Sequence, residues 1–143
     1  LDDVYNLMLS LLEIKYLRPE TLSSPEEVRR FLQVKLANRE HEVFSVVFLD
    51  SQHRVLSYEE MFRGTIDAAA VYPREIVKRC LQLNAAAVIF SHSHPSGVPD
   101  PSTADKRITE RLQAALALVD IIVLDHIVIG GADSVSMAER GML

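Results

Sequence analysis

Two histidines separated by one residue, His92 and His94, are the side chains of this sequence best placed to bind a metal ion. They follow a short apolar run at residues 85–90, which is typical of a strand buried on both faces. Residues i and i+2 of an extended chain point to the same side, about 6.6 Å apart, so two such imidazoles can converge on one metal with bonds of about 2.0–2.1 Å. The alternative is a pair of polar residues that leave the sheet into solvent.

A third donor, Asp105, follows a stiff segment. Residues 95–101 contain three prolines and a glycine and cannot form a regular element. Ser102 and Asp105 after them are typical of a helix N-terminus, where the acid favours the positive end of the helix dipole. Asp105 can also aim a carboxylate back toward the end of the strand, and the two interpretations are compatible. Two histidines and one carboxylate leave a fourth tetrahedral position open, which is typical of catalytic zinc.

Hydrophobic periodicity predicts the elements that position these residues. Helical spacing occurs over residues 3–15 and again from a capping signal at Ser24, and it predicts a helical lead-in over 1–38 that packs on the domain of residues 39–143. Further helices are expected over 73–83, with Ile76, Val77, Cys80 and Leu81 on one face, and over 102–118. Strands are expected over 43–49, 54–62, 85–90, 120–129 and, after a turn at 130–134, over 135–137. This alternation predicts an α/β fold with a mixed sheet flanked by helices.

Composition excludes several classes of protein. The 143 residues suit one domain, and no apolar run is long enough to span a membrane. A single cysteine fits a reducing compartment, so we expect a cytoplasmic protein. The net charge of −5 makes nucleic-acid binding by this chain alone unfavourable, because such affinity comes mostly from Lys and Arg. The chain starts at Leu1 without a signal-peptide pattern, and we expect it to be part of a longer protein.

The spacing His92-x-His94-x7-Ser102-x2-Asp105 resembles the signature of the MPN+/JAMM (JAB) metalloprotease domain. The segments at residues 62–67, 71–75, 83–87, 94–97 and 124–126 resemble the RadC-type bacterial branch of that family, and the likeness covers about residues 38–143. Position 93 is Ser where this branch commonly has Asn. We expect little consequence, because Ser93 lies between the ligands and faces the opposite way.

The resemblance implies a three-layer, cytidine-deaminase-like sandwich in which His92, His94 and Asp105 bind Zn²⁺. The spacing alone leaves five carboxylates as candidate bases: Glu40, Glu42, Glu59, Glu60 and Glu75. The resemblance selects Glu42 as the general acid/base and Ser102 as the residue that stabilises the tetrahedral intermediate. The implied activity is zinc-dependent hydrolysis of a peptide or isopeptide amide bond in a peptide or protein substrate. Iron and other metals also suit such a donor set.

The sequence also admits two other functional interpretations. RadC-type proteins carry a DNA-repair label, so the alternative function is an accessory module of repair or recombination that acts by binding. A zinc deaminase is disfavoured because the Pro-Cys-x-x-Cys part of its signature is absent. His126, within the strand expected at 120–129, is interpreted as a buried core histidine, with a supporting role toward a ligand as the alternative.

Overall fold

The structure, a computed structural model, describes residues 3–8, 25–64 and 71–143. Its elements in chain order are α2 (Pro25–Leu36), β1 (Val43–Leu49), β2 (Val55–Arg63), α3 (Pro73–Leu83), β3 (Ala87–Ser93), α4 (Thr103–Ala117), β4 (Ile122–Gly130) and β5 (Asp133–Ser136). Residues 3–8 are also helical. The strands form one five-stranded sheet in the order β2-β1-β3-β4-β5. Strands β3 and β4 pair in parallel and the other neighbours pair antiparallel, so the sheet is mixed.

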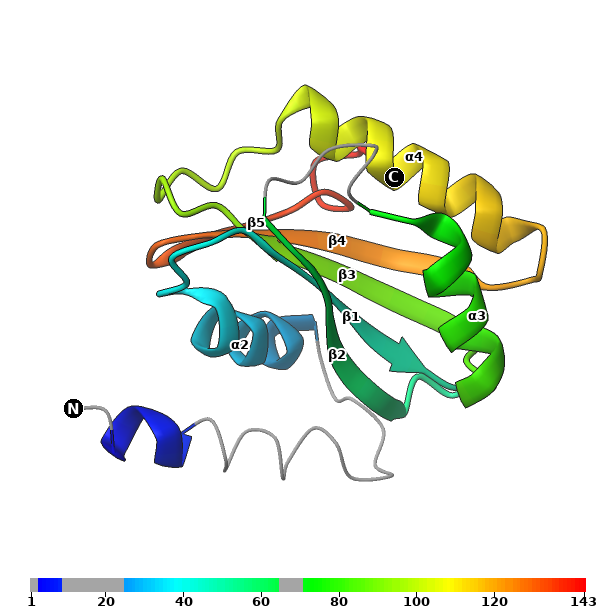
Figure 1. The fold of residues 1–143 in the computed structure, drawn as a ribbon, viewed down its shortest axis with the longest axis horizontal. Helices are drawn as coiled ribbons and strands as arrows, with labels where there is room; N and C mark the ends of the chain where they lie inside the picture. Colours follow the sequence, from blue (N-terminus) through cyan, green and yellow to red (C-terminus); the bar gives the residue numbers. More distant parts are fainter. Residues whose placement is uncertain (1–2, 9–24, 65–70) are drawn as a thin grey trace.

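Helices cover both faces of this sheet. Helix α2 lies on one face, and α3 and α4 lie on the other (Figure 1). The three layers confirm the predicted α/β sandwich with a mixed central sheet. None of the helices within the described ranges is both long enough and apolar enough to cross a membrane. The division after residue 38 stays a prediction, although α2 from the expected lead-in does supply one of the layers.

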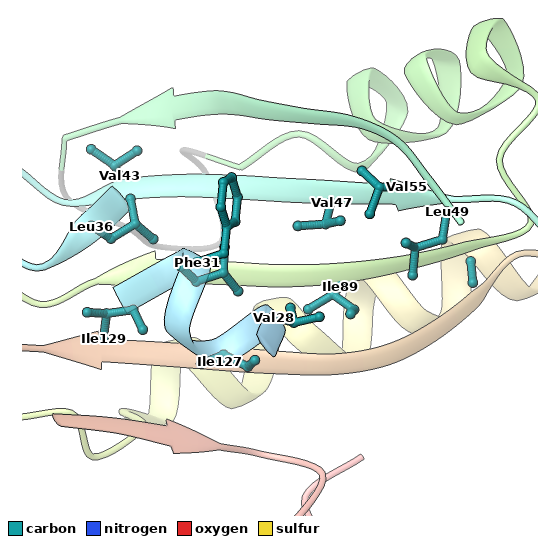
Figure 2. Close-up of a cluster of buried hydrophobic side chains, with 12 residues drawn as sticks. Val28, Phe31, Leu36, Val43, Val47, Leu49, Val55, Ile89, Ile127 and Ile129 are labelled. Carbon is teal, nitrogen blue, oxygen red and sulfur yellow. The ribbon is translucent and has the colours of Figure 1, made fainter. Parts of the chain in front are cut away.

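Alternation along the central strands separates two hydrophobic cores. Val47 and Leu49 of β1 belong to the core on the α2 side of the sheet, together with Val28 and Phe31 of that helix (Figure 2). Phe44 and Phe48 point the other way, toward α3 and α4. All seven residues of β3 are buried, as the continuous apolar run predicted. Since His92 is two residues beyond Phe90, which belongs to the second core, its side chain lies on the face covered by α4.

A bulge in β4 changes this alternation just before His126. Val88 of β3 pairs with Val123 and Ile89 pairs with Asp125, so Leu124 is an extra residue in β4. Leu124 packs with the core under α2. Because of this extra residue, every later side chain of β4 points to the opposite face from the one that simple alternation would give. His126 is therefore on the α4 face, with its ring 6.0 Å from that of Phe90 and beside His92.

The element boundaries confirm most of the predicted ones. Strand β1 and helix α3 have the expected bounds, and β2 and α4 differ by a residue at their ends. Strand β3 begins two residues later than expected and continues through His92 to Ser93. Strand β5 begins at Asp133 instead of residue 135, because Gly131, with a φ of 59°, completes a tighter turn than the one predicted over 130–134. Residues 9–15 of the helix predicted over 3–15 lie outside the described residues, and so does Ser24, the predicted cap of the helix that follows.

The apolar face predicted for α3 is only partly buried. Leu81, which the hydrophobic pattern groups on one face with Ile76, Val77 and Cys80, is 59% exposed. Ile76 and Cys80 of that helix are fully buried. Leu81 instead lines an open groove between α3 and α4, together with Leu118. Helix α3 packs on the sheet along a narrower stripe than the hydrophobic pattern suggested.

Candidate metal centre

The two histidines of the motif converge at the carboxyl end of β3. His92 is the penultimate residue of the strand and His94 directly follows it. Their Nε2 atoms are 2.9 Å apart. His92 is fully buried, whereas the His94 side chain is 13% exposed. The donor pair is thus held by the sheet on one side and can be reached from solvent on the other.

Asp105 completes the group from the first turn of α4. Its Oδ1 lies 2.9 Å from His92 Nε2 and its Oδ2 lies 3.1 Å from His94 Nε2. The same carboxylate accepts a hydrogen bond from the backbone N–H of Ser102, and the Asp105 N–H donates to Ser102 Oγ. This reciprocal capping box fixes the helix start. The predicted helix cap and the predicted third donor are therefore the same residue in the same conformation.

The histidines and Asp105 shift one another's pKa values. Burial by itself would raise the pKa of Asp105, but hydrogen bonds from His92 and His94 outweigh it and hold that pKa well below its usual range. The pKa of His94 is raised, chiefly by its hydrogen bond to Asp105 and against the effect of burial. Asp105 is therefore an ionised carboxylate that faces two imidazoles, which is the charge state required of a metal ligand.

The spacing of the donor atoms fits a small divalent ion. His92, His94 and Asp105 form the group of metal-ligating side chains found within the described residues, with candidate ligand atoms all within 4.8 Å of one another. Tetrahedral coordination with bonds of about 2.0–2.1 Å places neighbouring donors roughly 3.3 Å apart. The observed contacts of 2.9–3.1 Å are close to this value. Two imidazoles and one carboxylate are also a donor set that zinc accepts.

The rigid segment after β3 orients the His94 ring. His94 Nδ1 donates to the backbone carbonyl of Val98, 2.8 Å away, which leaves Nε2 for the centre. This contact requires the segment to lie close against β4 at Gly130. A Cβ atom added there would be 2.5 Å from the Pro99 nitrogen and 2.7 Å from the Val98 carbonyl carbon. Only glycine permits this approach, so Gly130 belongs to the framework of the site.

Aromatic and imidazole rings enclose His92. The ring of Phe44 stacks on it at an interplanar angle of 16°, with centroids 6.4 Å apart. His92 Nδ1 lies 2.8 Å from Nε2 of His126, which is completely buried. Burial lowers the pKa of His126 well below its ordinary value, so that ring is neutral. The prediction of a buried histidine at 126 is confirmed, and its direct bond to His92 corresponds to the supporting role given as the alternative.

Glu42 and Ser102, the two residues proposed for chemistry, act on the donor group in different ways. Glu42 immediately precedes β1, is half-buried, and accepts a hydrogen bond from the Gly64 N–H at its carbonyl. Its carboxylate helps to raise the pKa of His94, so the two groups are electrostatically coupled. Ser102 caps α4 through a lone pair of its oxygen, which leaves its O–H proton available to donate. Their catalytic roles stay predictions.

Ser93 has a structural role that sequence reasoning did not anticipate. Its hydroxyl accepts from the Val43 N–H at 3.1 Å and donates to the His41 carbonyl at 3.3 Å. These two backbone groups flank Glu42 in the chain. A position expected to matter little therefore fixes the backbone on both sides of the candidate base. These two partners lie 50 and 52 residues away in the chain, so no local pattern could reveal them.

Comparison with known proteins agrees with this geometry. A family model described as the RadC-like JAB domain matches residues 22–142. The chain belongs to this family. A UPF0758 protein of Vibrio cholerae is 59% identical over 133 residues, which cover 93% of this chain and 84% of the relative.

Two further relatives of this RadC-like chain are longer proteins. UPF0758 proteins of Methylibium petroleiphilum and Cellvibrio japonicus are each 60% identical, over 84% and 87% of this chain. The matched regions are 54% and 55% of those relatives. The chain thus spans little more than half of the length of these two proteins.

Proposed function

We propose that this RadC-like JAB domain is a zinc-dependent hydrolase that cleaves an amide bond in a peptide or isopeptide substrate. The observation that carries the proposal is the convergence of His92, His94 and Asp105 at one point beside solvent. Three protein donors with an open fourth position are characteristic of catalytic zinc sites. When bound, zinc would supply a Lewis acid that lowers the pKa of a coordinated water to about 7.

Glu42 manages the proton in the proposed reaction. Its carboxylate accepts a proton from the attacking water, and the water oxygen forms a bond to the amide carbon. As the C–N bond breaks, Glu42 returns the proton to the leaving amine, so it ends the cycle as it began. The backbone groups on both sides of Glu42 are held by Ser93, which keeps the base in a fixed position.

Ser102 stabilises the charge that develops on the amide oxygen. Its oxygen already accepts from the Asp105 N–H, so the hydroxyl cannot rotate freely and its proton points away from that N–H. A fixed donor of this kind costs no reorganisation during the reaction. The capping box therefore orients a ligand and an oxyanion donor together.

The test is a comparison of Glu42→Gln with the zinc-loaded parent chain on a library of internally quenched peptides and isopeptides. We expect Glu42→Gln to keep stoichiometric zinc and to lose about 10²–10⁴-fold in turnover, because the amide cannot accept the proton. Glu40→Gln is the matched control, since Glu40 is exposed two residues earlier, and it should retain activity. Unchanged turnover in Glu42→Gln would assign the base to another group.

A further inference from the structure

Three hydrogen bonds connect one candidate metal ligand to another through the interior of the protein. His92 Nδ1 lies 2.8 Å from His126 Nε2, and His126 Nδ1 lies 2.6 Å from Thr109 Oγ1. Thr109 Oγ1 in turn lies 2.7 Å from the backbone carbonyl oxygen of Asp105. The side chains of His92, His126 and Thr109 are fully buried, so water does not compete for these bonds. The chain of bonds begins at one metal donor and ends on the backbone of another.

The last bond sets the direction of all three. A carbonyl oxygen can only accept, and two oxygens 2.7 Å apart repel each other unless a hydrogen lies between them. The single hydroxyl proton of Thr109 is therefore directed to Asp105. Thr109 Oγ1 is then an acceptor for His126. The His126 ring is completely buried and its two nitrogens bond to His92 and Thr109, so it holds a single proton, on Nδ1.

The direction of these hydrogen bonds determines which nitrogen of His92 remains to bind a metal. With its proton on Nδ1, His126 presents the lone pair of Nε2 to His92, and His92 must donate from its own Nδ1. His92 Nε2, which lies 2.9 Å from His94 Nε2 and 2.9 Å from Asp105 Oδ1, is then the nitrogen left for a metal, and a bound ion would replace the proton that it shares with Asp105. A histidine that binds a metal through Nε2 needs this tautomer.

We propose that His126 and Thr109 are positioning residues that hold His92 in the Nδ1–H tautomer and so prepare its Nε2 for the metal. The inference rests on the proposed function, since it assigns a role toward the metal of that site. The bulge at Leu124 turns His126 to this face, and the position of Thr109 four residues after Asp105 returns the chain of bonds to a second donor. The tautomer of His92 and the placement of Asp105 are thereby coupled.

The matched variants are Thr109→Val, which removes the hydroxyl at nearly constant volume, and Thr109→Ser, which keeps it. In Thr109→Val the buried Nδ1–H of His126 loses its acceptor, and the reversed tautomer would place a proton on His92 Nε2. Calorimetric titration with Zn²⁺ alone should show about 10–100-fold weaker binding for Thr109→Val, and binding close to the parent for Thr109→Ser. Equal zinc affinity in all three proteins would overturn the inference.

Nitrogen-15 NMR of the histidine rings supplies a readout that does not depend on a variant folding. In the parent protein we expect His126 protonated at Nδ1 and, with zinc bound, His92 protonated at Nδ1. A His126 protonated at Nε2 would overturn the inference even if Thr109→Val fails to fold. A parent chain that binds no zinc would overturn the proposed function and this inference together, whereas tight binding by both parent and Thr109→Val would overturn the inference alone.

Discussion

Ser102 and Asp105 show how single residues serve both folding and chemistry. Their capping box satisfies backbone N–H groups at the start of α4, and the same atoms place a carboxylate between two imidazoles. A sequence reader can recognise the capping pattern and the metal pattern separately. In the structure both patterns hold at once, because Oδ1 of Asp105 faces His92 while Oδ2 accepts from the Ser102 N–H and also faces His94.

Substitutions of Ser102 separate these two tasks. Ser102→Ala should lower the free energy of unfolding by about 0.5–2 kcal/mol through loss of the cap. It should also lower turnover by about 10²–10³-fold through loss of the oxyanion donor. Ser102→Asp keeps a capping acceptor but has no proton to donate at neutral pH. It should therefore keep the stability of the parent and lose turnover. Denaturant unfolding and peptide cleavage measure the two effects, and full activity in Ser102→Asp would remove the donor role.

At the scale of elements, the site depends on how strands and loops approach one another. Strand β3 delivers His92, α4 delivers Asp105, and the segment at 95–101 orients His94 while lying against β4. Local patterns predicted each of these elements, since apolar runs, prolines and capping residues are local signals. They did not predict the bulge at Leu124 or the role of Gly130, because both arise where two distant segments meet.

Gly130→Ala tests this framework. The added methyl would collide with the backbone of Val98 and Pro99, displace the carbonyl that orients His94, and weaken zinc binding by about tenfold or more. Gly141→Ala is the control, because it strains the backbone at a φ of 70° in a turn where the methyl meets no neighbouring atom. It should reduce the melting temperature without reducing zinc affinity. Parent-like zinc affinity in a folded Gly130→Ala would contradict the importance of the close approach.

At the scale of the whole molecule, the net charge and the ion pairs affect whether the chain can bind nucleic acid. The chain carries a net charge of −5, and two of its helical arginines are already engaged. Arg29 of α2 binds Glu139, and Arg79 of α3 binds Glu59 of β2. These ion pairs connect elements across the fold and neutralise cations that would otherwise contact phosphates. The fold class and the family followed from the sequence, whereas the identity of the substrate has no comparable local signal.

This charge distribution predicts weak binding of DNA by the chain. Fluorescence anisotropy with a labelled duplex at about 50 mM salt should show no saturable binding at micromolar protein concentrations, since few phosphates can be neutralised. The comparison at about 200 mM salt is the control, because phosphate contacts lose affinity steeply over that range. Tight binding at the lower salt with such a loss would favour the accessory module that acts by binding DNA.

The most direct test of the central claim is the zinc content of the chain after loading and dialysis, measured by elemental analysis in the parent and in His94→Ala. We predict stoichiometric zinc in the parent and loss of zinc in His94→Ala, because two donors cannot hold the ion as three do. His53→Asn is the control, since His53 is an exposed turn residue with a φ of 60° that Asn tolerates, and it should keep its zinc. Zinc retained by a folded His94→Ala at the level of the parent, or a parent that holds none, would contradict the account.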